Sequence, residues 1–211
     1  MLTAIALVIF AYLLGSVPFA LVIGKGIYGV DVRDQGSGNI GATNVFRVLG
    51  KRAGVLVFAC DVLKGFIPVY LSLHLPASLT SNISTIENVQ VMAVFVAGAA
   101  IAGHTFPIFL KFRGGKGVAT GSGTILALMP LLFLVTFVVF WVVLIGTRTV
   151  SISSLTAVTG LCILVIGTDQ PTPYIDFTFV GAAVIFYAHR SNIRRIRKGE
   201  ENRVTFPWNR K

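Results

Sequence analysis

The stretch VATGSGTILALMPLLFLVTFVVFWVVLIG, residues 118–146, decides how this chain is folded. As one helix it would be about 43 Å long at 1.5 Å per residue. That is too long for a hydrocarbon core of about 30 Å without strong tilt. Proline is well tolerated in the first turn of a helix, so Pro130 can open a second helix. We therefore expect a break at Met129–Pro130 and two short membrane spans in place of one.

The composition of the 211-residue chain is typical of an integral membrane protein. Hydrophobic residues make up 55% and charged residues only 12%, whereas an average soluble domain is about 25% charged. The mean hydropathy is +0.82. The first apolar run, Leu2 to Ile23, lacks a basic leader and is too long for a signal peptide, so we interpret it as a retained span. No long polar linker interrupts the chain, which favours one domain over residues 1–211.

The apolar runs and the basic residues together predict a topology. The expected spans cover approximately residues 2–23, 53–75, 89–110, 118–129, 130–146, 152–167 and 177–188. With these seven spans, every Lys and Arg outside them falls on one side, and Glu87, Asp169 and Asp176 fall on the other. Positive residues gather on the cytoplasmic side. We therefore expect an all-α protein of seven transmembrane helices, with the N-terminus outside and the C-terminus in the cytoplasm.

The net charge of +10 does not indicate a nucleic-acid partner. The cytoplasmic bias of Lys and Arg accounts for it, and no soluble module remains to carry basic readout. Cys60 and Cys162 lie in apolar runs without metal-ligand spacing, and we expect buried structural residues there, not a disulfide or redox pair. The aromatic residues Phe206 and Trp208 are expected to pack the tail on the membrane surface.

Asp61 and Lys64 are three residues apart inside the second span, so they share one helix face. An ionisable residue inside a span is a functional candidate. The alternative, which we favour, is a neutralising pair that fixes helix packing.

Three polar, glycine-rich or basic segments fall on the expected cytoplasmic face: Gly36 to Gly50, Lys111 to Gly123, and His189 to Glu201. Such backbone is tolerated in a membrane protein only where protein or water surrounds it. The fourth and sixth spans begin just after Gly117 and near Ser151, and helix starts offer unpaired N–H groups and partial positive charge. Helix starts, glycines and cations together favour an anion site.

A short helix is also expected to begin near Ser37 or Asn39, since either residue can act as N-cap. On that helix Asn39, Thr43 and Arg47 would form one polar stripe, with Asn44 beside it.

Two apparent nucleotide motifs are set aside. Residues 36–41, Gly-Ser-Gly-Asn-Ile-Gly, match GxGxxG but follow a transmembrane helix and not a strand, which excludes a dinucleotide fold. Residues 114–117, Gly-Gly-Lys-Gly, lack the Ser or Thr that follows lysine in a P-loop, and Leu110 stands where the first glycine belongs.

His104 and His189 lie at the expected cytoplasmic ends of the third and seventh spans. Either can be a general base, or a histidine hydrogen-bonded to backbone at a helix end. His74 faces the other side and is expected to be structural.

Three segments carry a family resemblance. They are Ser37-Gly-Asn-Ile-Gly-Ala-Thr-Asn44 with Arg47, Gly103-His-Thr-Phe-Pro with Lys111-Phe-Arg-Gly-Gly-Lys-Gly-Val-Ala-Thr120, and His189-Arg-Ser-Asn-Ile with Lys198-Gly-Glu-Glu201. In this order they resemble the three signature motifs of the bacterial acyl-phosphate:glycerol-3-phosphate acyltransferases, the PlsY family. The resemblance covers nearly the whole chain and includes a seven-span layout.

The resemblance implies a reaction in phospholipid biosynthesis. A fatty acyl group would pass from acyl phosphate to the 1-hydroxyl of sn-glycerol 3-phosphate, giving lysophosphatidic acid and phosphate. The enzyme would lie in the inner (plasma) membrane of a bacterium, among membrane lipid, with its active site on the cytoplasmic face. We expect no metal and no cofactor.

The resemblance also implies residue roles. Catalytic roles fall to Ser37, Arg47 and His189. Substrate-binding roles fall to Asn39, Asn44, Gly115, Lys116, Gly117, Ser151 and Asn192. Glu201 is expected to be a structural end to the third motif.

Some alternatives remain open. Either His189 or a phosphate oxygen of the substrate can take the hydroxyl proton, and Ser37 can act in chemistry or only hold a phosphate. A transporter of a phosphorylated metabolite is the alternative function, but such proteins bind substrate near the midplane between internal repeats, and no repeat relates the two halves here. A structural membrane protein would leave the three polar segments unexplained.

Overall fold

The structure is a computed structural model that describes residues 2–76 and 86–205, and every regular element in these ranges is helical. The chain divides into two compact units, Met1–Met129 and Pro130–Lys211. The boundary between them is the Met129–Pro130 step at which the sequence predicts a helix break. Most of the loop expected between residues 76 and 88, and the tail residues Phe206 and Trp208, lie outside the described ranges.

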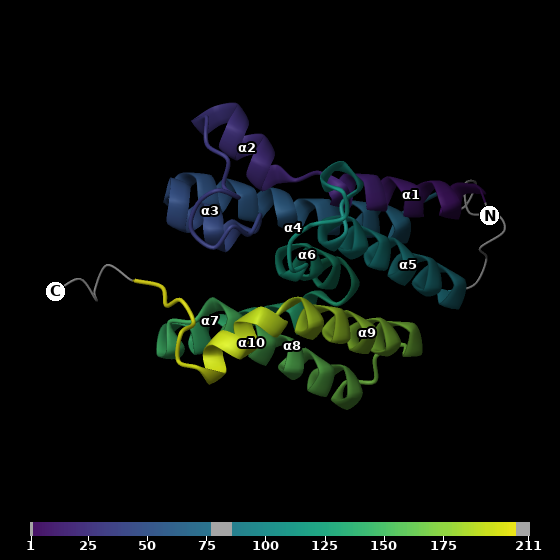
Figure 1. Cartoon of the computed structure of the whole chain (residues 1–211). Helices are drawn as coiled ribbons and strands as arrows, with labels where there is room; N and C mark the ends of the chain where they lie inside the picture. The colour runs from purple at the N-terminus through teal and green to yellow at the C-terminus, as the bar shows by residue number, and fades with distance from the viewer. Residues whose placement is uncertain (1, 77–85, 206–211) are drawn as a thin grey trace. The chain divides into compact units, whose positions relative to one another are not determined.

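The first unit contains six α-helices and one short 3₁₀ helix in its described residues. They are α1 (Leu2–Ser16), α2 (Phe19–Tyr28), α3 (Ala42–Leu49), α4 (Lys51–Leu73), α5 (Ile86–Thr105), η2 (Ile108–Leu110) and α6 (Val118–Leu128). Helix α1 packs along α5, and α4 packs against α6, α5 and α3 (Figure 1). At the α4–α6 contact, a side chain on Gly65 or Gly123 would overlap the facing backbone. Small residues thus bring these two helices together, as is usual in membrane bundles.

The first expected span, residues 2–23, consists of two helices and not one. Helix α1 ends at Ser16, and α2 begins at Phe19 at an angle of 44° to it. The cause is Pro18, which restricts the preceding residue to extended conformations and has no N–H to donate. The carbonyl oxygen of Val17 at the break accepts hydrogen bonds from the N–H of Phe19 at 3.1 Å and from Nζ of Lys64 at 2.9 Å.

A hydrophobic cluster joins α2, α3 and α4 and positions the segment between α2 and α3. Val32 and Ile40 from this segment are buried beside Val45 of α3 and Val57 of α4. The polar loop between Val32 and Ile40 is therefore anchored at both ends in the core.

The second unit contains α7 (Pro130–Thr147), α8 (Val150–Gly167), α9 (Thr172–Ala188) and α10 (Arg190–Arg197). Helix α7 packs on α8, and α8 packs on α9. The predicted break at Met129–Pro130 is confirmed, since α6 ends at Leu128 and α7 begins at Pro130.

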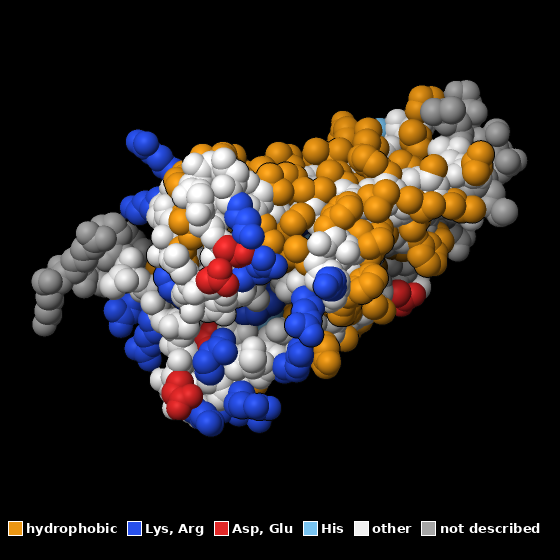
Figure 2. Space-filling view, turned by 45° about the horizontal axis from the view of Figure 1, so that its top comes forward, with side chains coloured by type: hydrophobic (Ala, Val, Ile, Leu, Met, Phe, Trp, Pro, Cys, Tyr) orange, Lys and Arg blue, Asp and Glu red, His pale blue; other side chains and the backbone are white. Residues whose placement is uncertain are grey.

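The helices have the lengths and surfaces of membrane spans. Among the residues that the structure describes, four stretches are long and apolar enough to cross a bilayer, and the bent pair α1–α2 makes a fifth if it is counted as one span. The four are Lys51–Leu73, Asn88–Leu110, Pro130–Thr147 and Val150–Gly167. Helices α6 and α9 are apolar but shorter. Only 11% of α7 is buried within the protein, and hydrophobic side chains cover broad areas of the surface in Figure 2. An apolar exposed surface of this kind suits lipid contact. Both cysteines are free, and each is half-buried, whereas the sequence predicted fully buried residues.

Candidate active site

The segment from Gly36 to Gly50 is a loop followed by a helix that starts later than expected. Helix α3 begins at Ala42 with Gly41 at its N-cap position, so the predicted start near Ser37 or Asn39 is wrong. Gly36 and Gly38 have φ of 64° and 69°, which belongs to turns and not to a right-handed helix. Oδ1 of Asn39 accepts a 2.9 Å hydrogen bond from the N–H of Gly41, which closes a turn just before α3.

The predicted polar stripe is therefore also wrong in one member. Asn39 lies outside α3, and only Thr43 and Arg47 remain on the helix at i, i+4 spacing. Both of these side chains are exposed, as is Ser37 in the loop. Ser37 and Arg47 thus present a hydroxyl and a guanidinium to the outside of the first unit.

Asn44 has a role within the loop that spacing alone does not reveal. Its side chain is buried, and Nδ2 donates to the carbonyl oxygens of Val32 at 2.8 Å and Gln35 at 3.1 Å. Oδ1 accepts a hydrogen bond of 2.8 Å from the N–H of Ser37. One amide thereby holds the loop that carries Ser37 at three points, including Ser37 itself. A polar residue on the buried face of a short amphipathic helix was the available clue.

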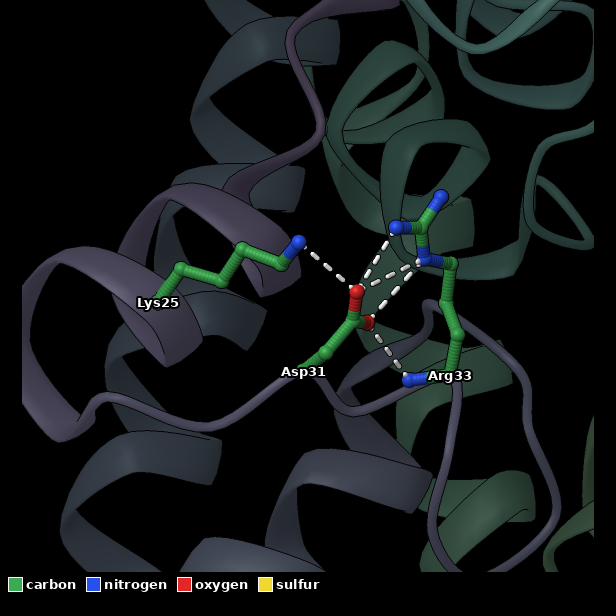
Figure 3. Close-up of polar contacts among 3 residues, drawn as sticks. All are labelled: Lys25, Asp31 and Arg33. Carbon is green, nitrogen blue, oxygen red and sulfur yellow. Dashed lines mark hydrogen bonds and ion pairs between the residues drawn. The ribbon is translucent and has the colours of Figure 1, made fainter.

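Asp31 binds two basic residues, Lys25 of α2 and Arg33 at the start of this loop (Figure 3). Oδ2 of Asp31 lies 2.8 Å from Nζ of Lys25 and 2.6 Å from Nη2 of Arg33, and Nε of Arg33 donates to Oδ1 at 3.0 Å. Hydrogen bonds from Arg33 and then Lys25 hold the pKa of Asp31 well below its usual range, and the same contact raises the pKa of Arg33. Lys25 and Arg33 therefore share a carboxylate, which makes Arg47 the better candidate for an incoming anion.

Residues Gly114–Gly117, the glycine turn, lie against the C-terminal end of α5. The N–H groups of Gly114 and Gly115 donate to the carbonyl oxygens of Thr105 at 3.1 Å and His104 at 3.0 Å. These carbonyls belong to the last turn of α5, where no helical partner is available. A side chain on Gly114 would overlap the His104 carbonyl, and one on Gly115 would overlap the His104 ring. The turn can therefore approach α5 only because both residues are glycine.

The glycine turn ends at the start of α6, as the sequence predicts. Gly117, with φ of 79°, is the N-cap residue, and no side chain of the described residues caps it. The backbone N–H groups that open α6 follow directly after Lys116, whose side chain is half-buried. A cation next to a helix start is a favourable arrangement for a phosphate.

The predicted pairing of Asp61 and Lys64 is confirmed. Nζ of Lys64 lies 2.8 Å from Oδ1 of Asp61, and the two side chains are 3% and 2% exposed. His104 is buried beside them, with Nδ1 at 3.7 Å from the same Oδ1.

In the second unit, Glu201 brings together residues of α8, α10 and the tail. Its Oε1 accepts hydrogen bonds from Oγ of Ser151 at 2.8 Å and Nδ2 of Asn192 at 2.5 Å, and its Oε2 accepts one from Nε of Arg195 at 2.7 Å. We call these four residues the Glu201 cluster. Burial opposes ionisation of Glu201, but the hydrogen bonds from Asn192, Arg195 and Ser151 outweigh it and lower its pKa. Two residues predicted at the site, Ser151 and Asn192, thus lie side by side.

His189 stands between α9 and α10 and is buried. Its Nδ1 lies 2.8 Å from the carbonyl oxygen of Ile185. A carbonyl can only accept, so Nδ1 carries the hydrogen and Nε2 of the neutral ring is the basic nitrogen. Within residues 2–76 and 86–205, no three His, Cys, Asp or Glu side chains gather as metal ligands would.

The chain has close relatives of known class. The family model described as glycerol-3-phosphate acyltransferase matches residues 5–199. The glycerol-3-phosphate acyltransferase of Geobacillus kaustophilus is 41% identical over 209 residues, covering 99% of this chain and 100% of the relative. That of Endomicrobium trichonymphae is 43% identical over 204 residues, covering 97% of each.

Two solved structures are similar throughout. They are crystal structures of PlsY, an integral membrane glycerol 3-phosphate acyltransferase, in its glycerol 3-phosphate form and its lysophosphatidic acid form. Both are 42% identical to this chain, with TM-scores of 0.85 and 0.83; each covers 96% of this chain, which in turn covers 96% and 95% of them. The chain therefore belongs to the glycerol-3-phosphate acyltransferase family.

Proposed function

We propose that this protein transfers a fatty acyl group from acyl phosphate to the 1-hydroxyl of sn-glycerol 3-phosphate, forming lysophosphatidic acid and releasing phosphate. The observation that carries the proposal is the match over 96% of the chain, at 42% identity, to PlsY structures named for glycerol 3-phosphate and lysophosphatidic acid. These two compounds are the acceptor and the product of one acylation.

In this reaction the hydroxyl oxygen attacks the acyl carbonyl carbon, and the bond from that carbon to the phosphate oxygen breaks. Phosphate leaves with the bonding electrons, and the hydroxyl proton goes to a base. Acyl phosphate is already activated, so the protein must align the two substrates and neutralise two phosphates. Alignment alone can supply up to about 7–11 kcal/mol of the barrier, and fixed cationic and N–H donors add electrostatic stabilisation.

The first unit supplies the cations in this proposal. Arg47 and Ser37 bind a phosphate and serve the chemistry, with Asn39 beside them, while Asn44 acts by holding the Ser37 loop through its three hydrogen bonds. Lys116, with the N–H groups of the glycine turn and of the start of α6, holds the phosphate of glycerol 3-phosphate. Gly115 and Gly117 serve by letting the backbone come close.

The other residues to which the family resemblance assigns roles, Ser151, His189 and Asn192, belong to the second unit. Nε2 of His189 is the basic nitrogen of the neutral ring, which suits it to take the hydroxyl proton. The alternative base is a phosphate oxygen of the substrate. The kcat of His189→Ala measured over pH separates them, because retained turnover with weaker binding excludes the histidine.

We further propose that the chain works as a single domain of seven membrane spans, formed by α1–α2, α4, α5, α6, α7, α8 and α9. The N-terminus lies outside, and the polar segments face the cytoplasm of a bacterium at its inner membrane. Supporting this topology, the basic residues outside the spans all fall on one side of it. A C-terminal reporter that is active only outside the cell would contradict it.

The test is an assay of purified protein with palmitoyl phosphate and radiolabelled sn-glycerol 3-phosphate. We expect labelled lysophosphatidic acid, and vesicle uptake of label without acyl product would instead favour a transporter. Arg47→Ala should lose most activity, because it removes a phosphate-binding cation. Lys198→Ala removes an exposed cation after α10 and should change little. A near-normal kcat/KM for Arg47→Ala would contradict its role.

A further inference from the structure

One buried cluster of ionisable side chains in the first unit has no role in the proposed reaction. Asp61 and Lys64 of α4 form an ion pair, and His104 of α5 faces it, all three side chains being no more than 5% exposed. Buried ionised pairs are expensive to desolvate, and charges inside a membrane span are rare and tied to function. This group therefore calls for a role beyond neutralisation.

His104 connects this group to the glycine turn in two ways. Its carbonyl oxygen accepts the N–H of Gly115 at 3.0 Å. Its ring lies directly against Gly115, so closely that a methyl group there would overlap Nε2. The other nitrogen of the same ring, Nδ1, lies 3.7 Å from Oδ1 of Asp61. The imidazole thus lies between the Asp61 carboxylate and the backbone of the turn.

The group is not arranged to react. His104 is 5% exposed, with the ion pair on one side and the backbone of Gly115 on the other. Lys64 is occupied by Asp61 and by the carbonyl oxygen of Val17. A role for His104 must therefore act through its neighbour, the turn.

We infer that His104, oriented by the Asp61–Lys64 pair, is a positioning residue that fixes the glycine turn and so places Lys116 for the phosphate of glycerol 3-phosphate. The inference rests on the proposed function for its ligand. A loop held in its binding conformation loses less entropy when the ligand binds. Binding of glycerol 3-phosphate should therefore weaken when His104 is changed, while turnover of bound substrate is affected less.

The experiment compares His104→Leu and His104→Gln with His74→Gln as the matched control. His74 is the C-cap residue of α4, where its ring stacks on Tyr70. For each variant, the Kd of sn-glycerol 3-phosphate is measured calorimetrically without acyl donor, and KM and kcat are measured with palmitoyl phosphate.

We expect His104→Leu to raise Kd and KM about tenfold to a hundredfold, with a smaller change in kcat. In His104→Gln the amide can still face Asp61, so a rise of about threefold, or about 0.65 kcal/mol, is expected. His74→Gln should match the wild type.

A folded His104→Leu with wild-type Kd and KM overturns the inference. If that variant does not fold, His104→Gln decides, and wild-type Kd and KM in it overturn the inference. A loss confined to kcat, with Kd unchanged, also overturns it, because it would assign the ring to chemistry. Wild-type protein that binds sn-glycerol 3-phosphate but makes no lysophosphatidic acid refutes the proposed function instead, and the Kd comparison still tests His104.

Discussion

The glycine turn of the first unit and the Glu201 cluster of the second hold their polar residues by opposite means. The turn lies flat on the end of α5 because residues 114 and 115 have no side chains, and its bonds run between backbone groups. The cluster depends on one carboxylate that accepts hydrogen bonds from three side chains. An added methyl group should therefore damage the first, and the loss of a charge should damage the second.

The largest effect is expected from Gly114→Ala. The new Cβ would overlap the carbonyl oxygen of His104, a backbone atom that cannot rotate away. The turn must move, and Lys116 moves with it. We expect kcat/KM for sn-glycerol 3-phosphate to fall about a hundredfold, the loss that a displacement of about 1 Å can cause.

The control is Gly160→Ala on α8, where a Cβ has open space. Its activity in the same assay should equal that of the wild type. Equal losses in the two variants would mean that the close approach at residue 114 is not what matters.

The next largest effect is expected from Glu201→Gln, which keeps the shape and removes the charge. Arg195 then loses its ion partner, and the hydrogen bonds from Ser151 and Asn192 lose their charged acceptor. Hydrogen bonds to charged groups contribute about 1.5–3 kcal/mol each, so we expect Tm to fall by several degrees and kcat/KM about tenfold. Glu200→Gln, which changes the exposed neighbour, is the control, and an equal Tm in both variants would contradict the prediction.

The same carboxylate predicts a pH dependence. Hydrogen bonds lower the pKa of Glu201 in the folded protein, so the stability it contributes is fully present above the ordinary glutamate pKa. That stability is lost as the pH falls through the lowered pKa of the folded state. Thermal melting measured from neutral to acidic pH should therefore decline less steeply in Glu201→Gln than in the wild type. Parallel curves would show that Glu201 does not titrate as expected.

The smallest effect is expected from Asp31→Asn, which tests whether a carboxylate with exposed partners matters less than the carboxylate of Glu201. Asp31 also gathers several donors, but its partners Lys25 and Arg33 are 54% and 47% exposed. Solvent screens such pairs. We expect kcat/KM to change less than about threefold. A loss as large as that of Glu201→Gln would instead place Lys25 or Arg33 in substrate binding.

Local rules account for the parts of the molecule that were predictable from sequence. The break at Met129–Pro130, the start of α6 after Gly117 and the pairing of Asp61 with Lys64 each depend on residues within a few positions of one another. The polar segments and the family could be recognised for the same reason, because their motifs are continuous.

Long-range contacts account for most of what was missed. Ser151 and Glu201 are 50 residues apart, so spacing gives no sign that they bond. The late start of α3 depends on Asn44 taking the N–H of Ser37, a contact that exists only once the loop has folded. The break at Pro18 is a different case, because the proline is a local signal for it. It was missed because apolar residues on both sides of Pro18 form one continuous hydrophobic run, although they belong to two helices.

The bond from Lys64 to Val17 has a consequence for how the protein is made. Backbone carbonyls in hydrocarbon need hydrogen-bond partners, and the Val17 carbonyl accepts one bond from the nearby N–H of Phe19 at 3.1 Å and one from Lys64, 47 residues further along the chain. The break at Pro18 is therefore made before the chain that supplies its second hydrogen-bond donor, Lys64 of α4, has left the ribosome. The α1–α2 segment reaches its final set of hydrogen bonds only when α4 packs against it, although it is synthesised earlier than α4.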